Sequence, residues 1–320
     1  MMREIEDKER VCVTGAGGYV ASWLVKYVLL KRYMVHGTVR DPCNEEKAHL
    51  KKLEYASENL QLLKTDFLDI EGLCAAVAGC TGVFHVAWPA PAGSVTNPEV
   101  QLIEPPVVGT RNVMNSCLRA KARRAVVVSS VGAVFLNSSW PKNQAMDEEC
   151  WSDEEFCKNY YCLGKTVAES EALEYAKRGE LDIVTVCPSI VIRPMLQPTI
   201  NASSLLLLSI MKGLESVEDR DRSLVDVRDV ADALLLVYEK PEAKGRYICS
   251  SFEITMKELT DKLKSLYPNY NYPESFIKVD EDLKLSSEKL QNLGWKYRPL
   301  EESIHNSVNN CEERGVLPKV

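Results

Sequence analysis

VCVTGAGGYVA at residues 11–21 joins a short apolar run to a glycine-rich turn. Gly15 permits a tight turn between a strand and a helix. Gly18 lets the backbone approach a pyrophosphate, which the free N–H groups of a helix N-terminus can bind. Ala21 stands where a third glycine is usual, and apolar residues recur at helical spacing over residues 20–28. The strand before the turn and the helix after it favour a dinucleotide-binding turn over an ordinary glycine-rich turn.

The composition is that of a globular chain. Its 320 residues are 45% hydrophobic, which is enough for one large domain or one and a half. The net charge of -7 argues against nucleic acid as a partner, because phosphate binding needs a basic surface. Residues 1–10 are charged and have no apolar core, and no apolar stretch approaches the roughly 18 residues of a membrane span. We therefore expect a cytoplasmic protein without membrane association, as a monomer or weak dimer.

The chain has 11 cysteines but neither a secretion signal nor a C-x-x-C pair. Such thiols are expected to be reduced and packed as small hydrophobic groups, and no metal site is expected. Cys150 and Cys157 flank Trp151. They could form a redox-sensitive pair, although two packed thiols is the simpler interpretation.

Apolar segments typical of strands alternate with helical stretches in the first part of the chain. The expected strands are Val11–Thr14, Val35–Val39, Leu60–Lys64, Gly82–Ala87, Ala125–Val128 and Ile183–Cys187. The stretches between them, such as residues 72–78 and 110–120, have the composition and length of crossover helices. This alternation predicts an α/β fold with a Rossmann-type, doubly wound parallel sheet.

The alternation ends after Pro188, where the chain becomes rich in Pro, Tyr and Asn. Asp226 to Asp229 could cap an apolar helix over residues 230–238, which would bring the chain back to the sheet. We expect residues 1–188, with the returning segment 225–250, to form a dinucleotide-binding domain. Residues 189–224 and 251–320 are expected to form a smaller, mainly C-terminal substrate lobe.

The end of the second expected strand bears on the cofactor. A free ribose 2′-OH is normally bound by Asp or Glu about 20 residues past the glycine turn, and here Arg40 stands at that position. A guanidinium suits a 2′-phosphate, so the sequence favours NADP over NAD. A shift of one residue in the end of this strand would place Asp41 at the ribose instead. Asp66, after the third strand, either hydrogen-bonds the adenine amino group or caps the segment that begins at Leu68.

A phenol and an ammonium lie four residues apart in the run from Tyr161 to Lys165, one turn apart on one helix face. The spacing alone proves little, because Tyr27 and Lys31 repeat it. Tyr161 differs in context, since it follows a strand that ends in Ser129-Ser130, about where a third catalytic group is needed. The two hydroxyls could also simply satisfy the end of that strand.

These groups suit carbonyl reduction by a nicotinamide, which requires a hydride at carbon and a proton at oxygen. Tyr161 can donate the proton, while Lys165 and the charge of the oxidised cofactor stabilise the phenolate. Lys165 can also bind the nicotinamide ribose, and Ser130 can hold the substrate oxygen. We therefore expect Ser130, Tyr161 and Lys165 to be catalytic. His85 lies in an apolar strand and is more simply a core residue than a base.

Five longer runs are specific to one group of enzymes: VTGAGGY at 13–19, TVRDP at 38–42, DEECWSD at 147–153, LQPTINAS at 196–203 and VDVRDV at 225–230. On these runs the chain resembles, over nearly its whole length, the extended short-chain dehydrogenases/reductases of plant phenylpropanoid and flavonoid metabolism. That group includes cinnamoyl-CoA reductases, dihydroflavonol reductases and the short-chain type of cinnamyl-alcohol dehydrogenase.

The resemblance implies roles for individual residues. It makes Ser130, Tyr161 and Lys165 the catalytic triad and Arg40 the contact to the 2′-phosphate. With the motifs above, it predicts that the cofactor is bound by Gly15, Gly17, Gly18, Tyr19, Val20, Arg40, Lys47, Asp66, Phe67, Ala87, Tyr161, Lys165, Pro188 and Ser189. The residues expected at the substrate are Val131, Trp88 and Arg193.

The departures from the family pattern concern the substrate. Cinnamoyl-CoA reductases resemble KNWYCYGK around the catalytic Tyr, whereas residues 158–165 read KNYYCLGK, and the loop before Tyr160 looks shorter. Arg193 replaces a usual Gly and Trp88 a usual small residue, and Lys47 lies one residue farther along the chain than the family spacing. We therefore rank NADPH-dependent interconversion of hydroxycinnamaldehydes and their alcohols above reduction of the CoA thioester, with dihydroflavonol-type ketone reduction after both.

Two other functions stay open. A nucleotide-sugar epimerase or dehydratase shares the Ser, Tyr and Lys set, but it should favour an acidic residue where Arg40 stands. A non-enzymatic NADP-binding interaction protein would keep the fold after losing activity. Tyr161 and Lys165 argue against this second alternative, because a protein without activity has no need of them.

Overall fold

The computed structural model describes residues 9–89, 97, 99–155, 157, 159–192, 194–279 and 284–319. Its centre is a seven-stranded parallel sheet with the strand order β10-β6-β5-β4-β1-β2-β3. The strands are β1 (Arg10–Thr14), β2 (Met34–Val39), β3 (Leu60–Lys64), β4 (Gly82–His85), β5 (Arg124–Val128), β6 (Asp182–Pro188) and β10 (Gly245–Cys249). The predicted doubly wound parallel sheet is thus confirmed.

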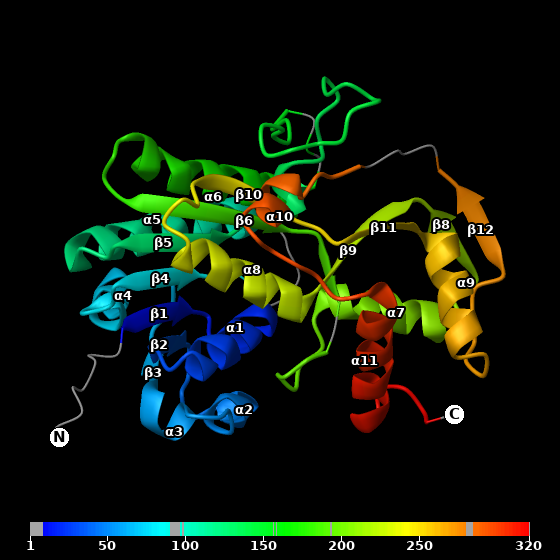
Figure 1. Ribbon diagram of the computed structural model, residues 1–320, viewed down its shortest axis with the longest axis horizontal. Coiled ribbons are helices and arrows are strands. Elements are labelled where there is room, and N and C mark those ends of the chain that lie inside the picture. Colours follow the sequence, from blue (N-terminus) through cyan, green and yellow to red (C-terminus); the bar gives the residue numbers. More distant parts are fainter. Residues whose placement is uncertain are drawn as a thin grey trace.

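Helices cover both faces of this sheet. On one face α1 (Tyr19–Leu30) and α8 (Val227–Glu239) lie side by side, and on the other face pack α4 (Ile70–Val77), α5 (Glu104–Ala120) and α6 (Tyr160–Lys177) (Figure 1). Val11 and Val13 of β1 belong to the core beneath α1 and α8, whereas Cys12 belongs to the core beneath α4, α5 and α6. This alternation explains why the strands read as continuous apolar runs, since side chains on both faces are buried.

Shorter helical segments connect these elements: η1 (Glu45–Lys47), α2 (Ala48–Lys51), α3 (Ala56–Asn59), η2 (Glu99–Ile103) and η3 (Val131–Ala133). Asn44 caps η1 by accepting a hydrogen bond from the Glu46 backbone N–H at 2.9 Å. The cap fixes the turn that follows β2, next to the glycine-rich turn.

A smaller lobe occupies the right of Figure 1. It contains a three-stranded sheet, β11-β9-β7, and a two-stranded sheet, β12-β8. Its strands are β7 (Ile190–Ile192), β8 (Ser216–Asp219), β9 (Asp221–Asp226), β11 (Phe252–Thr255) and β12 (Ser275–Lys278), and its helices are α7 (Ala202–Met211), α9 (Met256–Leu266) and α11 (Leu300–Glu313). The lobe has a hydrophobic core of its own, which includes Leu207, Leu259 and Ile304.

The chain returns to the main sheet after β9. Asp226 accepts a hydrogen bond from the Arg228 backbone N–H at 2.8 Å and so caps α8, as the sequence suggested. Strand β10 then pairs with β6 at the edge of the main sheet, and α10 (Glu288–Asn292) contacts β10. The domain limits at residues 188, 225 and 250 stay predictions. Across the described parts of the chain, no helix has the length and apolar character needed to cross a membrane.

Candidate active site

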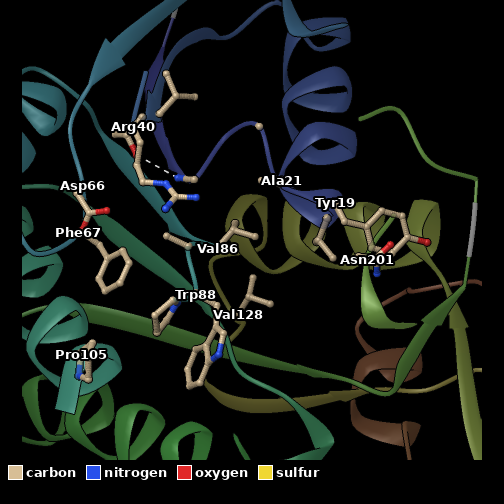
Figure 2. A pocket seen from close by; sticks show the side chains of 18 of the residues that line it. Tyr19, Ala21, Arg40, Asp66, Phe67, Val86, Trp88, Pro105, Val128 and Asn201 are labelled. Carbon is tan, nitrogen blue, oxygen red and sulfur yellow. Dashed lines mark hydrogen bonds between the residues drawn. The ribbon is translucent and has the colours of Figure 1, made fainter. Parts of the chain in front are cut away.

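A pocket of about 740 Å³ opens at the carboxyl ends of the main strands (Figure 2). It extends along the point where the strand order reverses between β1 and β4, which is where doubly wound sheets bind their ligands. In Figure 2, Arg40, Asp66 and Phe67 gather on one side of the pocket, with Trp88 and Val128 farther along it. Its volume is in the range of small-molecule and cofactor sites.

The glycine-rich turn forms one wall of this pocket. Gly15 has a φ of +64°, and a Cβ atom there would lie 3.0 Å from the Cα atom of Ala87. The position therefore requires glycine both for its backbone conformation and for the close approach of the chain after β4. A side chain at Gly17 would overlap the side chain of Lys47. The Lys47 side chain thus lies against the glycine-rich turn, although Lys47 is one residue farther along the chain than the family spacing.

The N-terminus of α1 suits an anion. Gly18 is the N-cap residue; it provides no side-chain cap, and the first turn contains no acidic residue. The backbone N–H groups of the first turn of α1 and the positive end of the helix dipole lie beside the pocket. Tyr19 and Val20 also line the pocket at this point. These features fit a pyrophosphate.

Arg40 is exposed at the end of β2 and lines the pocket. The alternative, Asp41, is partly engaged, because its Oδ1 atom accepts a hydrogen bond from the Cys43 backbone N–H at 2.9 Å. The end of β2 therefore carries an exposed cation and, beside it, a carboxylate with one oxygen already hydrogen-bonded. Arg40 and Lys47 together suit a phosphate group at this end of the pocket.

Asp66 and Phe67 follow β3 and also line the pocket. Asp66 accepts a hydrogen bond from the Leu68 backbone N–H at 3.0 Å, but the N-cap of α4 is Asp69. Asp66 therefore shapes the turn and does not cap the helix itself. The ring of Phe67 packs so closely on Gly109 of α5 that a side chain at Gly109 would overlap it.

The three candidate catalytic residues line the same part of the pocket. Asn159 caps α6 by accepting hydrogen bonds from the backbone N–H groups of Tyr161, at 3.0 Å, and Cys162. This cap sets Tyr161 in the first turn of the helix and Lys165 one turn later. Ser130 follows β5, its hydroxyl accepts a hydrogen bond from the Gly132 backbone N–H at 3.0 Å, and it lies near enough to Tyr161 to affect the pKa of the phenol.

Burial raises the pKa of Tyr161, and the nearby Ser130 hydroxyl opposes this shift. Although 44% of the residue is exposed, its hydroxyl end is enclosed. We expected Lys165 to lower the pKa of this phenol, but its ammonium is not among the groups that shift it. The Lys165 Nζ atom instead donates a hydrogen bond to the carbonyl oxygen of Val128 at 3.1 Å and lies 3.9 Å from the centre of the Trp88 ring.

Lys165 is only 5% exposed. Burial lowers the pKa of its ammonium to about 7, against the opposing effects of Cys187 and Glu169. Behind it, His85 is held between the hydroxyls of Thr14, at 3.0 Å, and Thr110, at 3.3 Å. Burial and the nearby Lys165 lower the pKa of His85 to about 3, so it is a neutral core residue, as expected.

The pocket continues to the residues after β6. Pro188 and Ser189 line it, and the Ser189 Oγ atom is buried with no hydrogen-bond partner among the described residues. A buried hydroxyl without a partner is costly. A polar ligand group at this position would satisfy it, which fits the carboxamide of a nicotinamide.

The predicted substrate residues have different locations. Trp88 is half-buried in the pocket. Val131 is only 7% exposed and belongs to a core cluster with Val134 and Ile248, and it does not line this pocket. Its burial argues against a substrate contact, so that role stays a prediction. Arg193 lies outside the described residues.

Several pocket residues were not predicted from the sequence. Thr38 accepts a hydrogen bond from the Gly15 backbone N–H at 3.0 Å, and Pro105 lines the pocket from α5. Asn201 and Ser203, at the start of α7, line the pocket from the smaller lobe. Both residues belong to the run at residues 196–203, on which the family resemblance partly rests, but the sequence analysis assigned them no role.

Cys150 and Cys157 are free thiols in the structure. The Cys150 Sγ atom donates to the Val134 carbonyl at 3.3 Å, and the Cys157 Sγ atom donates to the Asn159 carbonyl at 3.2 Å. Burial raises the pKa of Cys150 to about 11. This shift disfavours the reactive thiolate form at neutral pH.

Comparisons with known proteins agree with this geometry. The model of the NAD dependent epimerase/dehydratase family matches residues 11–249. The chain is 42% identical to cinnamoyl-CoA reductase 1 of Petunia hybrida, covering 96% of this chain and 93% of that protein. Among solved structures, vestitone reductase from alfalfa superposes with a TM-score of 0.84 at 27% identity, covering 97% of this chain and 100% of that one. Yeast methylglyoxal/isovaleraldehyde reductase Gre2 in complex with NADPH gives a TM-score of 0.82 at 25% identity, with coverage of 96% and 99%.

Proposed function

We propose that this chain, which belongs to the NAD dependent epimerase/dehydratase family, is an NADPH-dependent reductase of a hydroxycinnamoyl carbonyl. Within that family it belongs to the extended short-chain reductases related to plant cinnamoyl-CoA and dihydroflavonol reductases. The observation that carries this proposal is one pocket that has Arg40 at one end and Ser130, Tyr161 and Lys165 at the other. An NAD(P)-dependent oxidoreductase of this group is the assignment that the similarity itself supports.

The preferred substrate differs from the one ranked first from the sequence. Several similar plant proteins bear the name cinnamoyl-CoA reductase, which favours the CoA thioester over the aldehyde. We therefore place reduction of a hydroxycinnamoyl-CoA to its aldehyde first. Interconversion of the aldehyde and the alcohol comes second, and Trp88 supports it because a large side chain at this position narrows the pocket.

The residues present fit NADP. The α1 N-terminus would hold the pyrophosphate, Arg40 and Lys47 the 2′-phosphate, and Ser189 the nicotinamide end. Bound NADPH would supply the hydride. Ser130 would hold the carbonyl oxygen by a hydrogen bond, and Tyr161 would donate a proton to it. With a CoA thioester this gives a hemithioacetal, which collapses to the aldehyde as Tyr161 takes back the hydroxyl proton and CoA leaves as a thiolate that is protonated from solvent. Lys165 would bind the adjacent ribose, with its ammonium also hydrogen-bonded to the Val128 carbonyl.

The test is a comparison of substrates. Purified protein is mixed with NADPH and feruloyl-CoA, coniferaldehyde or a dihydroflavonol, and the NADPH absorbance is followed. Fastest turnover of feruloyl-CoA is the expected result. Fastest turnover of coniferaldehyde would restore the original ranking. No turnover of any carbonyl together with tightly retained NAD would indicate a nucleotide-sugar epimerase or dehydratase, and NADPH binding without any turnover would indicate an interaction protein.

We also propose that the protein acts in the cytoplasm as a monomer or weak dimer, with a small-molecule substrate and neither nucleic acid nor membrane as a partner. Its net charge of -7 supports the exclusion of nucleic acid. Light scattering of the purified protein over a concentration series measures the oligomeric state. A stable tetramer would contradict the proposed monomer or weak dimer.

A further inference from the structure

Trp88 lies against the catalytic face of α6. Its ring meets the Tyr161 ring edge-on, with 5.5 Å between centroids and an interplanar angle of 69°. The Lys165 ammonium lies over the same indole, 3.9 Å from its centroid. Since Tyr161 and Lys165 are one helical turn apart, a single indole contacts both candidate catalytic side chains.

Gly164 lies between these two residues on the helix and allows the close packing. A Cβ atom at Gly164 would come within 2.6 Å of the Leu102 carbonyl oxygen and within 3.5 Å of two carbon atoms of the Trp88 ring. Any side chain there would push η2 away from α6. The indole, η2 and α6 therefore form one packed unit beside the pocket.

The charge of Lys165 depends on this unit. The Lys165 ammonium is buried, and it is met by the Val128 carbonyl and the face of the Trp88 ring. Glu169 is one turn farther along α6, but its carboxylate is committed to Arg246, at 2.9 Å, and to other donors. An aromatic ring attracts a cation through its quadrupole, and this attraction is strongest where water is excluded.

We propose that Trp88 is a positioning residue, whose ring holds the Lys165 ammonium and the Tyr161 ring in the arrangement that proton transfer requires. The proposal rests on the proposed reductase function. It assigns Trp88 an effect on the chemical step, in addition to any contact with substrate. A residue that merely filled space could be replaced by any apolar side chain of suitable size.

The experiment compares Trp88→Leu, which keeps an apolar side chain but no ring, with Trp88→Phe, which keeps an aromatic face. Trp88→Leu should lower kcat about tenfold, with a smaller change in KM, and Trp88→Phe should recover most of the loss. Trp140→Leu is the matched control, because Trp140 lies in a loop outside the pocket lining and its indole N–H hydrogen-bonds, among the described residues, only to the local Gln144 carbonyl at 3.2 Å. NADPH affinity, thermal melting and near-UV circular dichroism are measured for each variant.

The pH profile separates positioning from packing. The groups that face Lys165 are His85 of β4, Cys187 of β6, and Glu169 and Tyr161 of its own helix. These groups are unchanged in both Trp88 variants. Loss of the ring should disfavour the ammonium, so the alkaline limb of the kcat profile should move to lower pH in Trp88→Leu, by roughly one unit, and return in Trp88→Phe.

A second readout does not depend on turnover. The rate of reductive methylation of Lys165, resolved by mass spectrometry over a pH series, gives the midpoint of its titration. Trp88→Leu should lower that midpoint and Trp88→Phe should not. Equal kcat and equal midpoints in Trp88→Leu and the unaltered protein, or equal losses in Leu and Phe, would overturn the proposal. If no carbonyl is turned over but the midpoint shifts as expected, the reductase function fails while the contact with Trp88 stands.

Discussion

The guanidinium of Arg246 on β10 pairs with the carboxylate of Glu169 on α6 at 2.9 Å, and both side chains are almost fully buried. Glu169 also accepts hydrogen bonds from Ser129, at 2.7 Å, and from Thr185, at 2.5 Å. Arg246 donates to the carbonyls of residues 133, 148 and 150. One ion pair therefore joins the edge strand, the catalytic helix and the loop that follows Ser130.

Replacing Glu169 by Gln should destabilise the protein strongly, because it leaves the Arg246 charge buried without its partner. The expected loss is about 3 kcal/mol in the free energy of unfolding, measured by urea denaturation. Glu171→Gln is the matched control on the same helix. Its partner Arg111, at 2.8 Å, is half-exposed, so this change should cost less than about 1 kcal/mol. Equal losses in the two variants would contradict the prediction.

Tyr161→Phe should abolish most of the turnover and leave cofactor binding intact, since it removes only the hydroxyl that donates the proton. We expect kcat to fall by about 100-fold or more. Thermal stability should change little, because phenylalanine keeps the ring that packs against Trp88. Tyr160→Phe controls for the loss of a neighbouring hydroxyl and should keep its activity. Full activity of the Tyr161 variant would remove this residue from the mechanism.

Arg40→Ser should weaken NADPH binding about tenfold or more, because it removes a charge-assisted contact to the 2′-phosphate. Binding of NADH, which lacks that phosphate, should be almost unchanged and serves as the internal control. Asp41→Asn is the second comparison and should leave the preference as it is, since Asp41 is engaged with the turn at Cys43. The measurement is the dissociation constant of NADPH and of NADH for each variant, obtained from cofactor fluorescence.

Lys165→Met should stabilise the fold while it removes activity. Burial lowers the pKa of Lys165 to about 7 in the folded protein, whereas in the unfolded chain it is about 10.4. The unfolded chain therefore binds more protons between these values, and Lys165 destabilises the fold most at and below pH 7. This penalty decreases as the pH rises from 7 to 10.4.

The melting temperature of Lys165→Met should accordingly exceed that of the unaltered protein at pH 6, by an amount equivalent to about 4 kcal/mol in the free energy of unfolding, and the two should converge near pH 10. Lys177→Met is the control, because Lys177 lies at the exposed end of the same helix. A constant difference at every pH would show that packing, and not the charge, causes the effect.

The strands were predictable because each is a short local run of strand-forming residues, and in β1, β4 and β5 almost all of these residues are buried. Residues 60–64 were predicted as β3 with both limits correct, and β1 differs by one residue. Helix α5 begins at Glu104, earlier than expected, because Pro105 and Pro106 occupy its first turn, where proline is tolerated. That start could not be read from a rule that treats proline as a helix breaker.

The chemistry of the site was only partly predictable. Gly15, Arg40 and Tyr161 follow sequence patterns and line one pocket. Burial raises the pKa of Tyr161, and the Lys165 ammonium points to Val128 and Trp88; the lowering expected from Lys165 together with the oxidised cofactor stays a prediction. Contacts between residues far apart in the chain, such as Trp88 with Lys165, leave no local pattern to recognise.

The main sheet is completed by a strand that comes late in the chain, since β10 ends at Cys249 and pairs with β6. During synthesis, β6 leaves the ribosome long before β10 and presents unpaired backbone groups along one side. Nascent chains therefore pass through a stage at which they can associate edge to edge. Chaperone demand should thus peak before β10 emerges, and truncations that end ahead of Gly245 should accumulate as insoluble material.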